Sequence, residues 1–183
     1  YIPKSTDTGR LPEVLKSRAE ALPEREVPEG VRFLVAAVDV QKNAFVVQVH
    51  GACPGDPFDL VLVDRFTIFK SKRRDQDDER LWVKPGTYAE DWDEITEHVI
   101  NASYPLEDGA GRMLVKLTVC DSGGREGVTS NAYAYFRRLR GKGMHGRFHL
   151  VKGDHIANKP RAYIDHPDSK QKGKQAIAKL NGL

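Results

Sequence analysis

The chain has 183 residues, of which 39% are hydrophobic and 30% charged, and its net charge is +3. This composition is typical of a soluble globular domain and excludes a disordered chain. No apolar run approaches the ~20 residues that span a bilayer, and the start lacks a signal-peptide core, so a membrane protein is excluded. Two cysteines are too few for a CxxC-type zinc site or a disulfide framework.

The charge is uneven along the chain. Residues 152–183 hold seven Lys or Arg residues and three acids, whereas the rest of the chain is nearly neutral. A basic tail favours a polyanion partner, although an ordinary solvated tail has the same composition. The first residues, "YIPKSTDTGR", lack an initiator Met and are typical of a piece excised from a longer chain.

The first half of the chain predicts a linker and then a group of strands. Residues 1–30 are predicted to be a linker with an accessory helix, which Pro23 and Pro28 end. Short turns then separate three apolar strands, at residues 32–40, 44–51 and 58–69. Strands joined by short turns predict an antiparallel meander. The charged segment that follows, "KSKRRDQDDERLW", has no amphipathic stripe and predicts a surface loop.

The second half alternates helices and strands. A helix is predicted over 88–105, with an apolar face of Trp92, Ile95, Val99 and Ile100. The later elements are a strand in "MLVKLTVCDSGG", a helix over 128–143 with Gly141 at its C-terminal stop, and a strand over 147–154. Residues 155–183 lack strong patterning, although "KQAIAKL" is compatible with the start of another helix.

The predicted order is β-β-β-α-β-α-β. An antiparallel meander followed by βα units gives an α/β protein, in which helices flank a mixed sheet. This is the ribonuclease H-like order. We therefore expect a ribonuclease H-like domain over 31–154 and a basic C-terminal tail or flap over 155–183.

Two predicted strands end in an acid, Asp39 in "LVAAVDVQ" and Asp121 in "KLTVCDSGG". If these strands are adjacent and parallel, both carboxylates lie at one sheet edge and repel each other unless a cation separates them. Mg²⁺ and Mn²⁺ prefer such oxygen ligands, and a pair of these ions can support phosphodiester cleavage. The alternative is that each Asp caps a turn, which is the commoner role of a single Asp at a strand end.

The residues beside these acids suggest contacts with a nucleic-acid backbone. Gly123 and Gly124 permit close backbone approach, and Ser122 is a candidate donor to a phosphate or a metal-bound water. Lys152 is a candidate point charge for a phosphate. A tight glycine turn and a solvated strand end explain the same residues without a ligand.

Other chemistries have no matching motif. The six His residues form no HExxH pattern, and the chain has neither a P-loop nor a GxGxxG motif. Ser122 has no evident His–Asp relay, which argues against a serine hydrolase.

The segments "VRFLVAAVDVQ", "GTYAEDWDEITEHVINASYP", "LTVCDSGG" and "FHLVKG" together resemble the nuclease domain of the large terminase subunit of tailed bacteriophages, in its lambda-like branch. The resemblance covers nearly all of residues 12–154. It implies a ribonuclease H-like endonuclease that cuts concatemeric viral DNA with two Mg²⁺ or Mn²⁺ ions, of which Asp39 and Asp121 are ligands.

The resemblance also implies partners and a third acid. The partners would be double-stranded DNA, the ATPase domain of the same parent chain, the small terminase subunit and the portal, in the host cytoplasm and without a membrane. The family places a third acidic ligand after a further strand, which this sequence does not show clearly. Asp154, Asp165 and Asp168 are weak candidates. The last two fit better in a basic flap near DNA, together with Lys159, Arg161, Lys170 and Lys172.

Two alternatives stay open. One is another ribonuclease H-like nuclease, of the resolvase or integrase type. The other is a ribonuclease H-like module that binds DNA or docks on the portal without catalysis.

Overall fold

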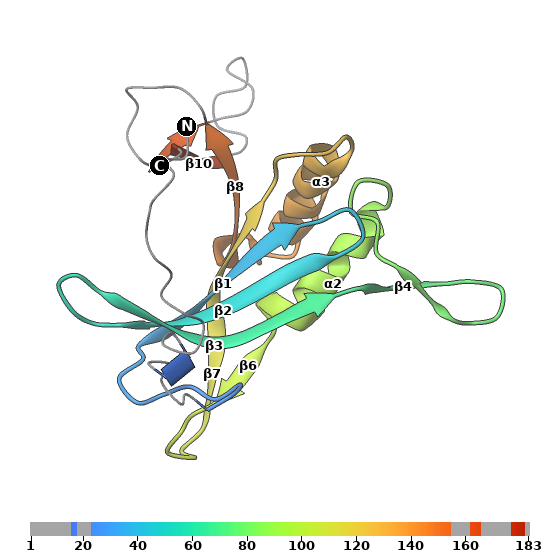
Figure 1. The fold of residues 1–183 in the computed structure, drawn as a ribbon. Coiled ribbons are helices and arrows are strands. Elements are labelled where there is room, and N and C mark those ends of the chain that lie inside the picture. Colours follow the sequence, from blue (N-terminus) through green and yellow to red (C-terminus); the bar gives the residue numbers. More distant parts are fainter. Residues whose placement is uncertain (1–15, 18–22, 155–161, 166–176, 182–183) are drawn as a thin grey trace.

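A curled mixed sheet forms the centre of the fold (Figure 1). The computed structural model describes residues 16–17, 23–154, 162–165 and 177–181. The main sheet has the order β3-β2-β1-β7-β8-β10-β9, and β6 pairs with β7. Its strands are β1 Phe33–Val40, β2 Phe45–Cys53, β3 Asp59–Ile68, β6 Ser103–Pro105, β7 Arg112–Asp121, β8 Phe148–Asp154, β9 Ala162–Asp165 and β10 Ile177–Asn181.

The pairing of the strands confirms the predicted meander and its continuation. β1 pairs antiparallel with β2, which pairs antiparallel with β3. β7 lies on the other side of β1 and runs parallel to it, and β8 is parallel to β7. This α/β architecture agrees with the ribonuclease H-like fold that the sequence predicts. It also makes the first and fourth predicted strands adjacent and parallel.

Helical segments pack against one face of the sheet (Figure 1). The first is a continuous run of three short pieces, η1 Ala89–Trp92, α2 Asp93–Ile95 and the π-helical turn η2 Thr96–Ile100. The second is α3 Val128–Gly141, which the short 3-10 turn η3 His145–Arg147 follows. The predicted helix over 88–105 is therefore too long at its end, because residues 103–105 pair with β7 as β6. None of the helices in the described residues is both long and apolar enough to cross a bilayer.

Four aromatic side chains join the sheet to the helical layer. The Trp92 ring lies 5.4 Å from that of Phe45 on β2 and 5.9 Å from that of Tyr135 on α3. The Tyr135 ring in turn lies 5.1 Å from that of Phe148 on β8. All four side chains are fully buried. Stacked and edge-to-face contacts of this kind add to the stabilisation that burial of their area provides.

The charged segment after β3 is an ordered hairpin and not the predicted loop. β4 Lys70–Arg74 pairs antiparallel with β5 Arg80–Trp82, and Figure 1 shows this hairpin projecting from the body of the domain. The Arg80 side chain donates to the backbone carbonyls of Ser71 (2.8 Å) and Lys70 (3.1 Å). Charged side chains thus hold the hairpin together, which is why its sequence shows no apolar alternation.

The sheet continues past Asp154. β10 is parallel to β8 and antiparallel to β9. The residues that we expected to start a helix, "KQAIAKL", therefore include most of a strand. The pairing with β8 supplies backbone hydrogen bonds that override the weak local pattern. The boundaries of the linker, domain and tail stay a prediction.

The lead-in segment contributes to the packed domain. Only residues 16–17 of the predicted accessory helix are described, and they are helical. Further along, Val27 is almost fully buried, and its N–H donates to the carbonyl of Pro105 at 2.9 Å. The Arg25 N–H donates to the carbonyl of Val63 on β3 at 3.0 Å. Part of the predicted linker therefore packs on the sheet.

The end of α3 is fixed by a glycine two residues after Gly141. Gly143 has a φ of +71°, and its N–H donates to the carbonyl of Arg140 at 3.1 Å. The next N–H, of Met144, donates to the carbonyl of Leu139 at 2.9 Å. This pair of bonds is a Schellman motif. Gly141 is the last helical residue, as expected, and Gly143 provides the left-handed cap.

The start of α3 has no room for a side chain at Gly127. Its φ is +79°, and a Cβ atom there would lie 2.0 Å from the carbonyl oxygen of Gly86. We expect Gly127→Ala to lower the free energy of unfolding by more than the roughly 1–2 kcal/mol that left-handed strain alone costs. Gly143→Ala is the matched control, because its φ is similar and its Cβ would meet nothing within 4 Å. Urea denaturation of both variants compares them, and equal losses would show that the contact with Gly86 relaxes freely.

Candidate metal centre

Asp39 and Asp121 lie at the same edge of the sheet. In the parallel pairing of β1 with β7, Val38 is opposite Cys120, and each aspartate is the next residue of its strand. Val38 and Cys120 are buried on the face that the helices cover. Because side chains alternate along a strand, both aspartates point to the other face. Asp39 is exposed there and Asp121 is half-buried.

Neutral donors hold both carboxylates. The Gln41 amide donates to Oδ2 of Asp39 at 2.6 Å, and the Gly123 N–H donates to Oδ1 of Asp121 at 2.9 Å. Burial raises the pKa of the Cys120 thiol well above its usual value, and the charges of Asp121 and Asp39 raise it further. Both negative charges therefore act on one buried group beneath the edge.

The two glycines and Lys152 border Asp121. A Cβ atom on Gly123 would lie 3.2 Å from Oδ1 of Asp121 and 3.7 Å from Cγ of Lys152, so the bare glycine lets these two side chains approach. Lys152 itself is exposed and follows Val151, the residue opposite Asp121 on β8. Gly124 has a φ of +101°, a conformation that favours glycine.

Ser122 lies inside the fold. Its side chain is fully buried, and its hydroxyl donates to the carbonyl of Val151 at 3.0 Å. Its own carbonyl accepts a hydrogen bond from the Thr129 hydroxyl at 2.7 Å. In this position Ser122 secures the turn after β7, and its hydroxyl is directed into the protein rather than toward a phosphate.

The three candidates for a third acidic ligand occupy different places. The backbone of Asp154 lies three residues beyond Val151 on β8, about 10 Å further along the strand than Asp121. Asp165 ends β9, which β8 and β10 separate from β7. Asp168 lies outside the described residues, as do the four basic tail residues Lys159, Arg161, Lys170 and Lys172.

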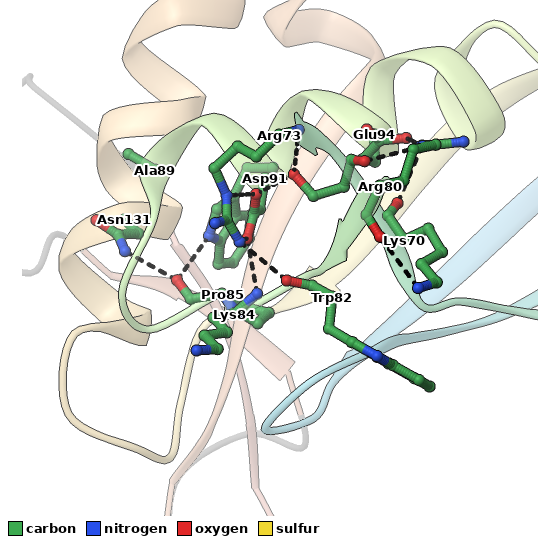
Figure 2. A network of polar contacts seen from close by, with 12 residues as sticks. Lys70, Arg73, Arg80, Trp82, Lys84, Pro85, Ala89, Asp91, Glu94 and Asn131 are labelled. Carbon is green, nitrogen blue, oxygen red and sulfur yellow. Dashed lines mark hydrogen bonds and ion pairs between the residues drawn. The ribbon is translucent and has the colours of Figure 1, made fainter. Parts of the chain in front are cut away.

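The sequence did not reveal an extensive polar network that surrounds Asp91 in η1 (Figure 2). Asp91 is fully buried and accepts two hydrogen bonds from Arg73 of the hairpin, at 2.7 and 2.9 Å. It also accepts one from the Ser71 hydroxyl and one from the Lys84 N–H at 2.7 Å. Burial opposes ionisation of Asp91, but these donors outweigh burial and lower its pKa.

A third acidic group lies further along the same helical run. Ligand atoms of Glu94, Glu97 and His98 lie within 4.8 Å of one another, close enough to hold a metal ion. Oε2 of Glu94 is 3.1 Å from both Arg80 and His98, and Glu97 pairs with Lys72. Oε1 of Glu94 is buried and has no hydrogen-bond partner. The spacing of three and four residues puts these side chains on one helix face. This spacing is the sequence feature from which the group could have been predicted.

Comparison with known families identifies the chain. The family described as "Terminase large subunit gpA, endonuclease domain" matches residues 4–182. The chain belongs to this family. The match confirms the resemblance seen in the sequence and makes this chain an endonuclease domain of a terminase. No curated protein matches the chain, and no solved structure matches it either.

Proposed function

We propose that this terminase domain is a divalent-metal-dependent DNA endonuclease that cuts concatemeric viral DNA during packaging, with Asp39 and Asp121 as metal ligands. The observation that carries the proposal is the register of β1 and β7. It places one aspartate on each of two central, parallel strands at the same level and on the same face. Rigid strands hold the two carboxylates in a fixed relation, which a metal site requires.

The ion pairs of the acidic side chains support this choice of ligands. Asp91, Glu94 and Glu97 each have an Arg or Lys partner. Among the ion pairs of the described residues, none includes Asp39 or Asp121. Two carboxylates outside the ion pairs of the described residues suit a hard divalent cation, and the neutral donors Gln41 and Gly123 leave other oxygen lone pairs free.

The residues of the chain would share the work around such an ion. Asp39 and Asp121 would hold it, and when bound it would activate water and stabilise the leaving oxygen of the scissile phosphate. The exposed Lys152 beside Asp121 would bind a phosphate as a point charge, and Gly123 keeps the approach to the edge open. Phosphate contacts position DNA without specifying its sequence, so the choice of cut site would come from partners.

The wider setting follows from the family. We propose an ATPase domain in the same parent chain, the small terminase subunit and the portal as partners, with double-stranded DNA as substrate in the host cytoplasm. Mg²⁺ and Mn²⁺ have the same preference for oxygen ligands, so either ion suits the two carboxylates.

The Glu94, Glu97 and His98 group is a second candidate for the metal, because one oxygen of Glu94 has no partner. Its charges favour a structural role. Arg80 and Lys72 already balance the two carboxylates, so an added cation would compete with both. Calorimetric titration of Asp39→Ala and Glu94→Gln with Mn²⁺ separates the two candidate sites. Asp39→Ala should lose Mn²⁺ binding if Asp39 is a ligand, and Glu94→Gln should lose it if Glu94 is a ligand.

Nicking of supercoiled plasmid in the presence of Mn²⁺ tests the proposal. We expect the wild-type chain to nick and Asp39→Ala to lose this activity. Asp77→Asn, which changes an exposed acid near the tip of the hairpin, should nick like the wild type and controls for charge. Nicking that Asp39→Ala leaves intact would refute the metal site. Absence of nicking by both the wild type and Asp39→Ala would favour the alternative that the domain is a non-catalytic docking module.

A further inference from the structure

Two exposed aromatic rings lie side by side where the hairpin leaves the sheet. The exposed fractions of Phe69 and Trp82 are 47% and 50%, and their rings meet edge to face with centroids 5.4 Å apart. They line a shallow hollow of about 410 Å³ together with residues 41–44, the turn between β1 and β2. Large apolar side chains left in water at such a place indicate a contact surface.

The backbone beneath these rings is rigid. The Phe69 carbonyl accepts the Val83 N–H at 2.9 Å, and the Trp82 carbonyl accepts from the Arg73 guanidinium at 2.9 Å. Arg73 is in turn fixed to the buried Asp91. Figure 2 shows the Trp82 ring pointing away from this network. The fold thus fixes the main chain and leaves the rings outside.

Basic side chains accompany the rings. Nζ of Lys70 lies 5.0 Å from the centroid of the Trp82 ring and is held by the carbonyl of Arg80 at 3.0 Å. Lys42 lines the same hollow. An aromatic surface flanked by positive charge is the combination that proteins use to stack nucleobases while they bind the backbone.

Gln41 connects the hollow with the proposed metal edge. Gln41 lines it, and the amide of the same residue donates to Asp39 at 2.6 Å. A strand of DNA whose phosphate lies at Asp39 would therefore have neighbouring nucleotides near Trp82. The exposed rings and the two lysines at this hollow suit a nucleobase and its phosphates.

We propose that Trp82, supported by Phe69, stacks on an unpaired nucleobase of the DNA strand next to the cut phosphate. Lys42 and Lys70 supply the positive charge for the adjoining backbone. This inference rests on the proposed nuclease function, and it adds that the enzyme engages DNA whose bases are locally separated. A base taken out of the stack loses its neighbours, and an aromatic ring replaces them.

Binding measurements without metal test the inference apart from cleavage. The probes are two short DNA duplexes of the same sequence, each with a single-nucleotide gap in one strand. In one probe the nucleotide opposite the gap carries its base, and in the other that nucleotide is abasic. Fluorescence anisotropy in EDTA gives the affinities. We expect the wild type to prefer the DNA with the base, and Trp82→Ala to bind it roughly 5- to 150-fold more weakly, the range for loss of one stacked base.

Two further variants make the result specific. Trp82→Phe should keep most of the preference, because it retains a ring. Phe58→Ala, which removes another exposed aromatic side chain, should bind like the wild type. Intrinsic fluorescence adds an independent readout, since Trp82 is exposed and the other tryptophan, Trp92, is fully buried. Quenching by the gapped DNA should disappear in Trp82→Phe.

Several outcomes would overturn the inference. One is a Trp82→Ala variant that keeps the wild-type preference for the base over the abasic residue. Another is normal DNA binding by Trp82→Ala together with loss of self-association in sedimentation, which would make the rings a protein contact. The plasmid assay with Asp39→Ala reports on the nuclease separately, so either proposal can fail alone.

Discussion

Asp91→Ala is expected to lower the free energy of unfolding by about 3–5 kcal/mol, the usual cost of removing one partner of a buried ion pair. The variant leaves Arg73 without its carboxylate and removes the acceptor of the Ser71 hydroxyl and the Lys84 N–H. Urea denaturation at neutral pH measures the loss. Asp77→Ala, at an exposed position of the hairpin, should change stability by less than about 0.5 kcal/mol.

The same network predicts how stability depends on pH. The pKa of Asp91 is lowered from its usual value of 3.8, because its hydrogen bonds favour the carboxylate more than burial opposes it. The contribution of the Asp91 carboxylate to the free energy of unfolding is therefore fully present above pH 3.8. It is lost as the pH falls through the lower pKa that Asp91 has in the folded state. The difference in stability between the wild type and Asp91→Ala should shrink in that acidic range. A difference that stays constant down to strong acid would show that packing, and not charge, explains the loss.

Asp39→Asn and Asp121→Asn should each reduce plasmid nicking by more than the roughly 10- to 100-fold that loss of an outer-shell partner costs a metal site. The double variant should be little worse than either single one, because residues that act as a unit have non-additive effects. Asparagine keeps the shape of the side chain, so the loss reports the missing charge. Initial nicking rates at several Mn²⁺ concentrations measure both effects.

The metal concentration gives a second check on this pair. A weakened site should recover part of its activity at high Mn²⁺, whereas a variant that merely misfolds should not. Urea denaturation of the same variants shows whether they fold. Losses that simply multiply in the double variant would mean that the two carboxylates act at separate places.

The sequence predicted the centre of the fold, including the two neighbouring strands that carry Asp39 and Asp121. The apolar run before Asp39 and the similar run before Asp121 identified two buried strands, and the order of elements made them neighbours. The predicted helix face of Trp92, Ile95, Val99 and Ile100 is fully buried. These features depend on hydrophobic periodicity, which a single sequence displays directly.

Features held by distant polar partners could not be predicted in this way. The hairpin depends on the contact between Arg73 and Asp91, which are 18 positions apart in the sequence. Its charged residues have the composition of a solvated loop. β10 is a strand because β8 and β9 pair with it, although its sequence alone also suits a helix. The burial of Ser122 beside Val151 could not be predicted, because no sequence pattern shows that these two residues are neighbours.

The turn between β7 and α3 has a thermodynamic consequence for the DNA binding that we propose. At one end of this turn, the Ser122 hydroxyl donates a hydrogen bond to the carbonyl of Val151. At the other end, Gly127 lies so close to Gly86 that residue 127 cannot carry a side chain. With both ends anchored, residues 122–127 can explore few conformations before a ligand arrives. Ordering a loose loop costs about 1–2 kcal/mol per residue in backbone entropy. Because the turn is already ordered when the protein folds, the DNA backbone that we propose at Gly123 and Gly124 would meet a preorganised surface.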